Sequence, residues 1–311
     1  MGLLALSGCL EFGLDPVDRD APPAWVLVTE HFVQTPLPGV DVLFVVDDTA
    51  SMEREQAALA ARLPALTELL LDIGVQWQIG VVSTDMTRED AGWLRGTPWV
   101  LTPGTEGLEA AIGEVLQVGT AGSPPEAGFA AAARALELSE PGGPNAGFRR
   151  PEAALHVIFV SDADDRSDGW LGSDPAGAFL DVLDLEAASG VSATASAVTG
   201  DEHIGCASEF GTAAAAPRYH EVTRQSGGAL VSICALEVAP LVDALSEATI
   251  AWPTTFELQE APVEETMRVT VDGVRMNEGW GVLFSPPRLI FDAPPAPEAR
   301  IDASYVVEVG L

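Results

Sequence analysis

Three strand-like apolar segments, residues 41–46, 78–83 and 155–160, most constrain the fold of this chain. A strand that is apolar along its whole length is buried on both faces, as in a parallel sheet covered by helices. Helical segments separate these strands, such as residues 52–71, in which Pro64 predicts a kink. Because strands that alternate with helices form βαβ units, we expect an α/β fold with a doubly wound, mostly parallel sheet and helices on both faces.

The alternation of strand-like and helix-like segments ends at Trp252-Pro253. The segments that follow are short and β-prone, and Asp272-Gly273 is a typical hairpin turn. We therefore predict three regions. Residues 1–23 form an N-terminal leader and tether, residues 24–252 form the α/β domain, and residues 253–311 form a small all-β module.

The charge of the chain is strongly negative. It has 47 acidic residues against 15 basic ones, a formal net charge of −32, and no lysine. A chain of this charge repels phosphate backbones, so nucleic acid is excluded as a partner class. Acidic loops suit hard cations such as Mg²⁺ and Ca²⁺, although most acidic residues in such a chain simply form a solvated surface.

The N-terminus contains a short apolar stretch that ends in Leu6-Ser7-Gly8-Cys9. Small residues directly before a cysteine resemble the lipobox of bacterial lipoproteins, although no basic residues precede the stretch. The resemblance implies that Cys9 carries lipid and that the mature protein is anchored to a membrane of the bacterial cell envelope, on its periplasmic face or at the cell surface. The alternative is an ordinary N-terminus with a chance cysteine.

Two further cysteines, Cys206 and Cys234, remain if Cys9 is lipidated. Exported proteins fold in compartments that permit disulfides, so we expect these two to pair. Two buried free thiols are the alternative. Neither a CxxC nor an HExxH pattern accompanies them, so a zinc site is not indicated.

Oxygen-bearing side chains follow two of the predicted strands. Asp47, Thr49 and Ser51 follow the first strand, and Asp162 follows the strand at 155–160. Thr120 lies in a polar glycine loop between them. Ligands of doubly wound sheets bind beyond the carboxyl ends of the strands, so these side chains predict a site at that edge. The alternative for Asp47 and Thr49 is that they only cap the next helix.

These residues resemble the metal-ion-dependent adhesion site of von Willebrand factor type A (VWA) domains, over about residues 40–250. The family pattern is D-x-S-x-S, then a threonine from a later loop, then an aspartate after a buried strand. Asp47, Thr49 and Ser51 match the first element, with threonine in place of the middle serine, and Thr120 and Asp162 match the other two. Ser123 lies close enough to compete with the threonine.

The resemblance implies a bound Mg²⁺, with Mn²⁺ and Ca²⁺ as alternatives. Thr49 and Ser51 would coordinate it directly, Asp47 and Asp162 would act through water or hydrogen bonds, and Thr120 would bind in one state only. Neutral hydroxyl ligands leave the cation poorly neutralised, so an acidic group of a protein partner can complete its coordination.

The function that we expect from the sequence is therefore metal-dependent protein binding or adhesion without catalysis. A structural scaffold with an inactive metal site is one alternative. A metal-dependent hydrolase is less favoured, because no G-x-S-x-G nucleophile elbow is present. The acidic cluster of Asp164, Asp165 and Asp168 indicates either a solvated loop or a second, calcium-like site.

Overall fold

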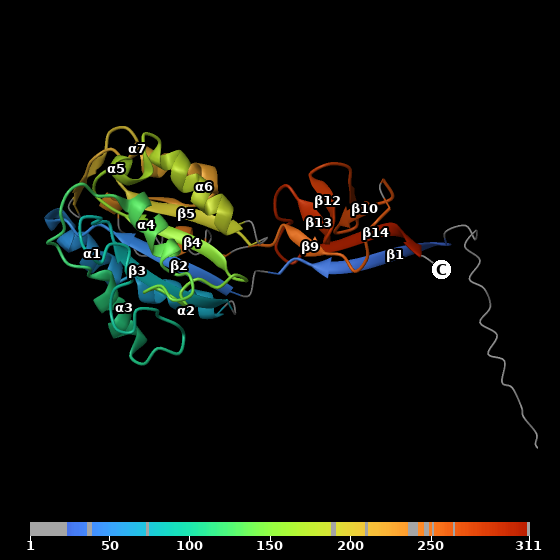
Figure 1. Cartoon of the computed structure of the whole chain (residues 1–311), viewed down its shortest axis with the longest axis horizontal. Helices are drawn as coiled ribbons and strands as arrows, with labels where there is room; N and C mark the ends of the chain where they lie inside the picture. Colours follow the sequence, from blue (N-terminus) through green and yellow to red (C-terminus); the bar gives the residue numbers. More distant parts are fainter. Residues whose placement is uncertain are drawn as a thin grey trace, which may run out of the picture. The chain divides into compact units, whose positions relative to one another are not determined.

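The computed structural model describes two compact units (Figure 1). One is an α/β unit, Gln34–Thr254 with Pro294–Glu298, and the other is a β unit built from the described parts of Met1–Val33, Thr255–Ala293 and Ala299–Leu311. The described residues are 24–35, 39–72, 75–187, 191–208, 211–235, 242–245, 249–250, 252–263 and 265–309. Cys9 and the predicted leader and tether lie outside them.

The α/β unit contains a five-stranded sheet whose paired strands all run parallel, in the order β3-β2-β4-β5-β8. Its strands are β2 (Gly39–Val46), β3 (Gln76–Ser83), β4 (Ala154–Val160), β5 (Ala193–Thr199) and β8 (Leu230–Ser232). All eight residues of β2 are buried, as the apolar run predicts. The parallel sheet of the expected α/β class is confirmed.

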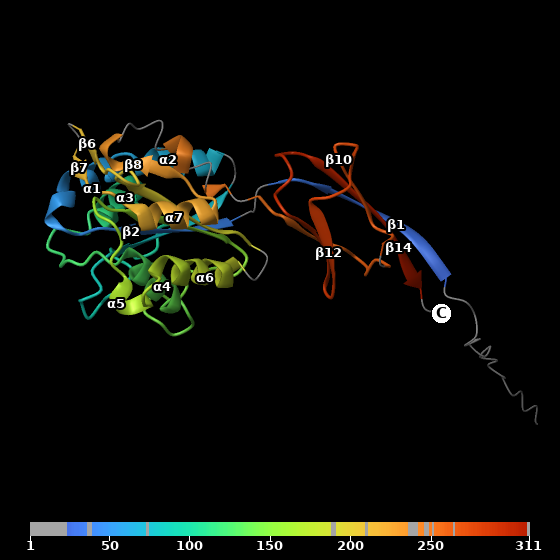
Figure 2. The same ribbon diagram turned by 90° about the horizontal axis from the view of Figure 1, so that it is seen from above.

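Helices cover both faces of this sheet (Figure 2). The first face packs against α1 (Glu53–Ala60), α2 (Leu63–Asp72) and α3 (Leu108–Leu116). The second packs against α4 (Gly128–Glu137), α6 (Pro175–Ala187) and α7 (Pro217–Ser226). The remaining short elements are η1 (Ala50–Met52), α5 (Asp168–Leu171), β6 (Cys206–Ala207), β7 (Thr212–Ala213) and η2 (Ile233–Ala235). Among the described residues, no helix combines the length and apolarity needed to cross a membrane.

Residues 52–71 form two helices rather than the single kinked helix predicted from the sequence. The chain leaves α1 after Ala60 and enters α2 at Leu63. Pro64 has no N–H to continue the hydrogen-bond ladder, and its ring would clash with the carbonyl four residues earlier. The proline is tolerated in the first turn of a new helix, so the segment breaks before it.

The β unit consists of two antiparallel sheets that enclose their own apolar core. One has the strand order β1-β14-β10-β11 and the other β12-β13-β9. The strands are β1 (Ala24–Val33), β9 (Thr255–Glu257), β10 (Arg268–Val271), β11 (Val274–Met276), β12 (Trp280–Phe284), β13 (Pro287–Phe291) and β14 (Arg300–Val309). Asp272 and Gly273 both have positive φ, 50° and 77°, and form the predicted hairpin turn.

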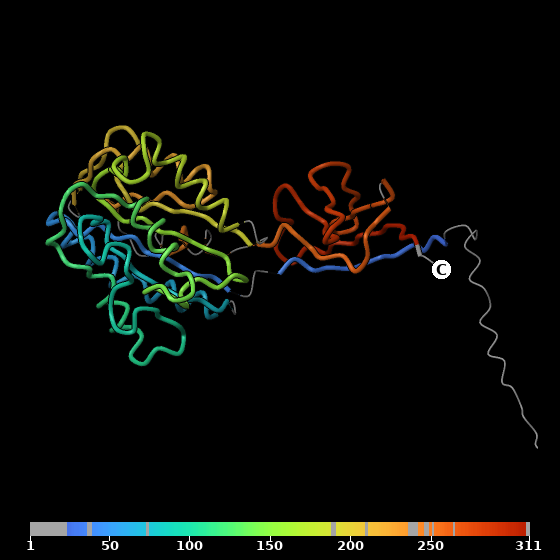
Figure 3. Tube along the Cα trace, viewed as in Figure 1, coloured from blue at the N-terminus to red at the C-terminus, as the bar shows by residue number. Residues whose placement is uncertain are grey.

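The position of β1 contradicts the predicted domain boundaries, which placed residues 24–33 in the α/β domain. It pairs with β14 along its whole length, from Ala24 opposite Val309 to Val33 opposite Arg300. Figure 3 shows this N-terminal strand running beside the C-terminal one. The β unit is thus assembled from both ends of the chain, and the α/β unit is inserted between them.

A buried histidine lies within the parallel sheet. His156 on β4 contacts Thr249 Oγ1 through Nδ1 at 2.6 Å and Ser196 Oγ through Nε2 at 2.7 Å. Burial lowers the pKa of His156 from its ordinary 6.5 to about 3. The folded protein therefore keeps this ring neutral at pH values at which the unfolded chain binds a proton.

We expect the stability contributed by neutral His156 to be complete above pH 6.5 and to fall as the pH drops below it. The loss is about 1.4 kcal/mol per pH unit. Urea unfolding at about pH 7.5 and about pH 5 should show that the wild type loses about 2 kcal/mol more than His156→Gln. His203→Gln, whose side chain is 79% exposed, is the control and should behave as the wild type. Equal pH dependence in wild type and His156→Gln would contradict this assignment.

Candidate metal centre

The carboxyl ends of β2 and β4 lie side by side and bring Asp47 next to Asp162. Val46 pairs with Val160 in the parallel register, and the Asp47 N–H donates to the Val160 carbonyl at 2.9 Å. The chain order reverses here, because β3 lies on one side of β2 and β4 on the other. Such a switch point is where doubly wound sheets bind their ligands.

The buried carboxylate of Asp47 shapes the loop that follows β2. Its Oδ1 accepts hydrogen bonds from the Thr49 N–H at 2.8 Å and from Thr49 Oγ1 at 2.7 Å, and its Oδ2 accepts one from Ser161 Oγ at 2.7 Å. No side-chain cap hydrogen bond forms at the start of η1 or of α1. The geometry therefore does not support the alternative in which Asp47 and Thr49 only cap the next helix.

Hydroxyl and carboxylate oxygens converge outside this buried aspartate. Thr49 Oγ1 lies 3.3 Å from Ser51 Oγ, and the Ser51 side chain is hydrogen-bonded to Asp162. Ser51 is exposed, while Thr49 and Asp162 are partly exposed. Four of the five predicted site residues therefore form one connected cluster that is open to solvent.

The glycine loop that carries Thr120 is held against the same edge. The Gln56 side-chain amide donates to the Asp47 carbonyl and to the Gly119 carbonyl, both at 2.8 Å, and the Gly122 N–H donates to the Asp48 carbonyl at 2.8 Å. A Cβ on Gly122 would lie 2.1 Å from Asp48 Oδ1, so only glycine allows this approach. Gln56 is a positioning residue that no sequence pattern singles out.

Thr120 itself is exposed, and in the described part of the chain its hydroxyl makes no hydrogen bond to the other four site residues. The structure brings its loop to the site but not its side chain into the cluster. The backbone N–H of the competing residue, Ser123, donates to Asp85 Oδ2 at 3.2 Å, which ties this end of the loop to the chain after β3.

Negative charge accumulates around the cluster. Burial raises the pKa of Asp162, and Asp47 raises it further, against the hydrogen bond from Ser51. Burial also raises the pKa of Glu126 and of Glu55, with neighbouring carboxylates adding to both. None of these four carboxylates forms an ion pair with a described arginine or histidine. A divalent cation at this edge would neutralise the excess charge.

Glu55, on the first turn of α1, was not singled out from the sequence. Its side chain is only 4% exposed, and its Oε2 has no hydrogen-bond partner. A buried carboxylate oxygen without a partner is costly, and it adds to the negative potential behind the site. In the described ranges, no group of three or more His, Cys, Asp or Glu side chains is arranged to hold a metal ion by itself. A cation here would depend on the hydroxyl ligands.

Asp165 is neither part of a solvated loop nor placed as a calcium ligand. It is fully buried, and its Oδ2 accepts the Phe129 N–H at 2.9 Å while Ser167 Oγ accepts the Ala130 N–H at 3.0 Å. These two side chains satisfy free N–H groups at the start of α4. Burial raises the pKa of Asp165 to about 6.

Asp164 and Asp168 are both bound by one arginine. The Arg218 guanidinium donates two hydrogen bonds, of 2.6 and 2.8 Å, to the Asp168 carboxylate. The backbone N–H of Arg218 donates to Asp164 Oδ1 at 3.1 Å. The loop after β4 is thereby fixed to the start of α7. This acidic cluster therefore has a structural function.

The predicted disulfide is present and joins β6 to η2. Cys206 and Cys234 are bonded, with 6.0 Å between their Cα atoms. The chain that follows β7 holds the site directly, because the Ala214 N–H donates to the Asp162 carbonyl at 2.8 Å. The disulfide thus cross-links the β6–β7 hairpin to η2, next to the Ala214 N–H that holds Asp162.

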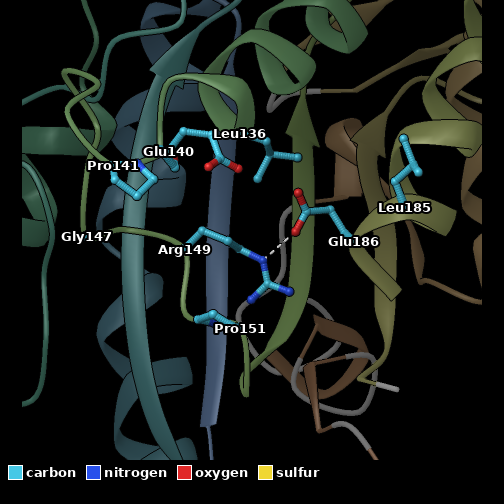
Figure 4. Close-up of a pocket in the computed structure, with 9 residues that line it drawn as sticks. Leu136, Glu140, Pro141, Gly147, Arg149, Pro151, Leu185 and Glu186 are labelled. Atoms are coloured by element: carbon cyan, nitrogen blue, oxygen red, sulfur yellow. Dashed lines mark hydrogen bonds and ion pairs between the residues drawn. The ribbon is translucent and has the colours of Figure 1, made fainter. Parts of the chain in front are cut away.

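A hollow of about 780 Å³ lies at the opposite edge of the sheet (Figure 4). Arg149 in its wall donates to Glu186 at 2.6 Å and to buried Asp41 at 3.0 Å. Asp41 stands near the amino end of β2, and Asp47 directly follows its carboxyl end. The hollow is therefore separate from the candidate metal centre.

Comparisons with known proteins give no family assignment. No protein-family model matches the sequence, and no curated protein is significantly similar to it. Similar solved structures include two of the pilus adhesin SpaC from Lactobacillus rhamnosus GG, at 13% and 14% identity with TM-scores of 0.39 and 0.35. Each match covers 92% of this chain, which spans only 41% and 42% of the adhesin chains.

A third similar structure is the proximal thread matrix protein 1 of the mussel byssus, at 11% identity with a TM-score of 0.41. This match covers 73% of the present chain and 51% of the mussel protein. Similarity at these levels identifies neither a family nor a function.

We expect Cys206→Ser with Cys234→Ser to lower the free energy of unfolding of the α/β unit by about 3 to 4 kcal/mol, because the cross-link lowers the conformational entropy of the unfolded chain. Urea unfolding, followed by far-UV circular dichroism, measures this change. Cys9→Ser is the matched control and should leave the transition unchanged. A double variant as stable as the wild type would show that the cross-link does not support the fold.

Proposed function

We propose that the α/β unit is a VWA-type domain that binds a divalent cation and uses it to dock an acidic group of a protein partner. The observation that carries the proposal is the connected cluster of Asp47, Thr49, Ser51 and Asp162 at the switch point of the sheet. The fifth predicted residue, Thr120, lies on the adjoining loop, within the segment that Gln56 and Gly122 fix.

The donor set fits Mg²⁺, which prefers hard oxygen ligands and retains water. The hydroxyls of Thr49 and Ser51 would hold the ion directly, since they face each other at 3.3 Å and are not buried. Asp47 would orient them from behind, because both of its carboxylate oxygens already accept hydrogen bonds from neutral donors. Asp162 accepts from Ser51 and would share the outer side of the site.

A cation bound by neutral hydroxyls retains much of its positive charge and attracts an anionic ligand. The protein supplies the geometry for this: a rigid sheet edge, a glycine loop that approaches closely, and an exposed Ser51. Thr120 would add its hydroxyl from the adjoining loop. A carboxylate of a partner protein, such as an Asp or Glu side chain, is the ligand chemistry that the site would accept.

Binding is favoured over catalysis because no G-x-S-x-G nucleophile elbow is present in the sequence. The carboxylate of Asp47 accepts three hydrogen bonds, from Thr49 and Ser161, and so orients the loop of the site. The scaffold alternative differs from the binding proposal in one measurable property, which is the ability to hold a cation.

Calorimetric titration of Mg²⁺, Mn²⁺ and Ca²⁺ at about 0.15 M salt tests the site, since salt screens unspecific attraction to the acidic surface. We expect one main site in the wild type. Ser51→Ala, which removes an exposed hydroxyl, should weaken it at least tenfold, and Asp47→Ala should abolish it. Gly122→Ala should also weaken it, because the added methyl group displaces the loop from Asp48.

Two matched variants serve as controls for this titration. Gly113→Ala on α3, where a Cβ meets open space, should leave the affinity unchanged. Thr120→Val should weaken binding and Ser123→Ala should not. Unaltered affinity in Asp47→Ala would place the cation elsewhere, and a wild type that binds none of the three cations would favour the scaffold.

We also propose that the protein is lipid-anchored in the bacterial cell envelope through Cys9. The lipobox-like Leu6-Ser7-Gly8-Cys9 supports this, together with a disulfide that suits an oxidising compartment. Mass spectrometry of the protein isolated from membranes should find an N-terminal fragment that begins at an acylated Cys9. Cys9→Ser should abolish both the modification and the recovery with membranes. An unmodified Met1 in the mature protein would contradict the proposal.

A further inference from the structure

Strand β1 forms an open edge of the β unit. It pairs with β14 over ten consecutive positions without a bulge, and the strand order β1-β14-β10-β11 leaves its other side without a partner among the described residues. In an antiparallel strand, half of the backbone N–H and C=O groups point away from the neighbour. The outward-pointing groups of alternate residues along this ten-residue strand are therefore available to pair with another strand.

This edge lacks the proline, the lysine and the bulge that commonly prevent strand addition. The sequence AWVLVTEHFV contains neither proline nor lysine, and it carries exposed apolar side chains instead. Trp25, Leu27 and Val33, which point away from the core, are 55%, 71% and 57% exposed. Val26 points to the core side, opposite buried Val307 of β14, but is still 47% exposed.

The charge of β1 contrasts with that of the chain. The whole protein carries 47 acidic residues, yet the only carboxylate on β1, Glu30, is 8% exposed and is bound by the Tyr305 hydroxyl and by the Gln259 N–H at 3.1 Å. Two copies of a chain with a net charge of −32 repel each other over most of their surface. Along β1 they can approach without opposing carboxylates.

The side chains of β1 are complementary to those of a second β1. In an antiparallel pairing centred on Thr29, Trp25 lies opposite Val33 of the second copy on the outer face. On the core side, half-exposed Val26 lies opposite Phe32 of the second copy. Pairs of aromatic and β-branched residues are favourable across antiparallel strands, and so is the central Thr29 pair. One register thus covers three of the four exposed apolar residues with apolar partners.

We propose that the protein forms a twofold symmetric dimer by antiparallel pairing of β1 with β1 of a second copy. The two four-stranded sheets then join into one continuous sheet. A twofold axis at Thr29 makes the same surface serve both partners, which is the commonest arrangement in soluble homo-oligomers. This interface involves the β unit and does not depend on the proposed cation site.

Sedimentation equilibrium of the full chain tests the dimer. The Cys9→Ser background prevents an intermolecular disulfide at that residue from imitating association. We expect a monomer–dimer equilibrium that Thr29→Lys weakens at least tenfold, because two like charges then meet at the axis. Val274→Lys makes the same charge change on β11, the other edge of the sheet, where the side chain is 68% exposed, and should leave dimerisation unchanged.

Cross-linking tests the register separately. Thr29→Cys should form a disulfide-linked dimer under mild oxidation, whereas Val274→Cys should not. A wild type that remains monomeric at about 100 μM, a concentration that detects even weak pairs, would overturn the proposal. Equal weakening by Thr29→Lys and Val274→Lys, or a Thr29→Cys chain that dimerises without cross-linking, would overturn it as well.

Discussion

The hydrogen bonds made by the buried carboxylate of Asp47 are the interaction on which the candidate site depends. They join the loop after β2 to Ser161 after β4, and the Asp47 N–H bonds to the carbonyl of Val160. A single side chain therefore fixes the relative position of two strand ends and the direction of the Thr49 hydroxyl. The protein itself sets this geometry, so a ligand would meet a site that is already ordered.

The distribution of arginines explains why the charge at this edge is not balanced. The chain has 15 basic residues and no lysine, so cationic partners are scarce. Several arginines are engaged by structural carboxylates: Arg149 and Arg150 bind Asp41 at 3.0 and 2.7 Å, and Arg218 binds Asp168. Within the described ranges, the carboxylates of the candidate site receive no such partner. The same scarcity that makes the protein acidic thus concentrates negative potential where the hydroxyls converge.

The parallel sheet was predictable because burial on both faces leaves a local pattern, the unbroken apolar run of residues such as 41–46. The proximity of Asp47 and Asp162 at its carboxyl edge was predictable for the same reason, since their positions follow from where those runs end. The cation, its direct ligands and the docked partner stay predictions, because they depend on a ligand that the sequence does not contain.

Features that depend on distant partners were not predictable. The apolar pattern of β1 is compatible with a strand in either unit. Only its pairing with β14, at the other end of the chain, assigns it to the β unit. Asp165 and Asp168 are spaced like ligands, but their roles are set by the start of α4 and by Arg218. Gln56 reaches two carbonyls from within a helix, and no local pattern marks such a contact.

The insertion of the α/β unit between β1 and β14 has a mechanical consequence. A pull applied between the chain ahead of residue 24 and the α/β unit runs along the covalent backbone of β1, which is already extended. Strand β14 and the strands beyond it lie beside that path and not on it. The β unit thus lies in parallel with this connection, so a force between the chain ahead of residue 24 and the α/β unit does not have to unfold the two β sheets first.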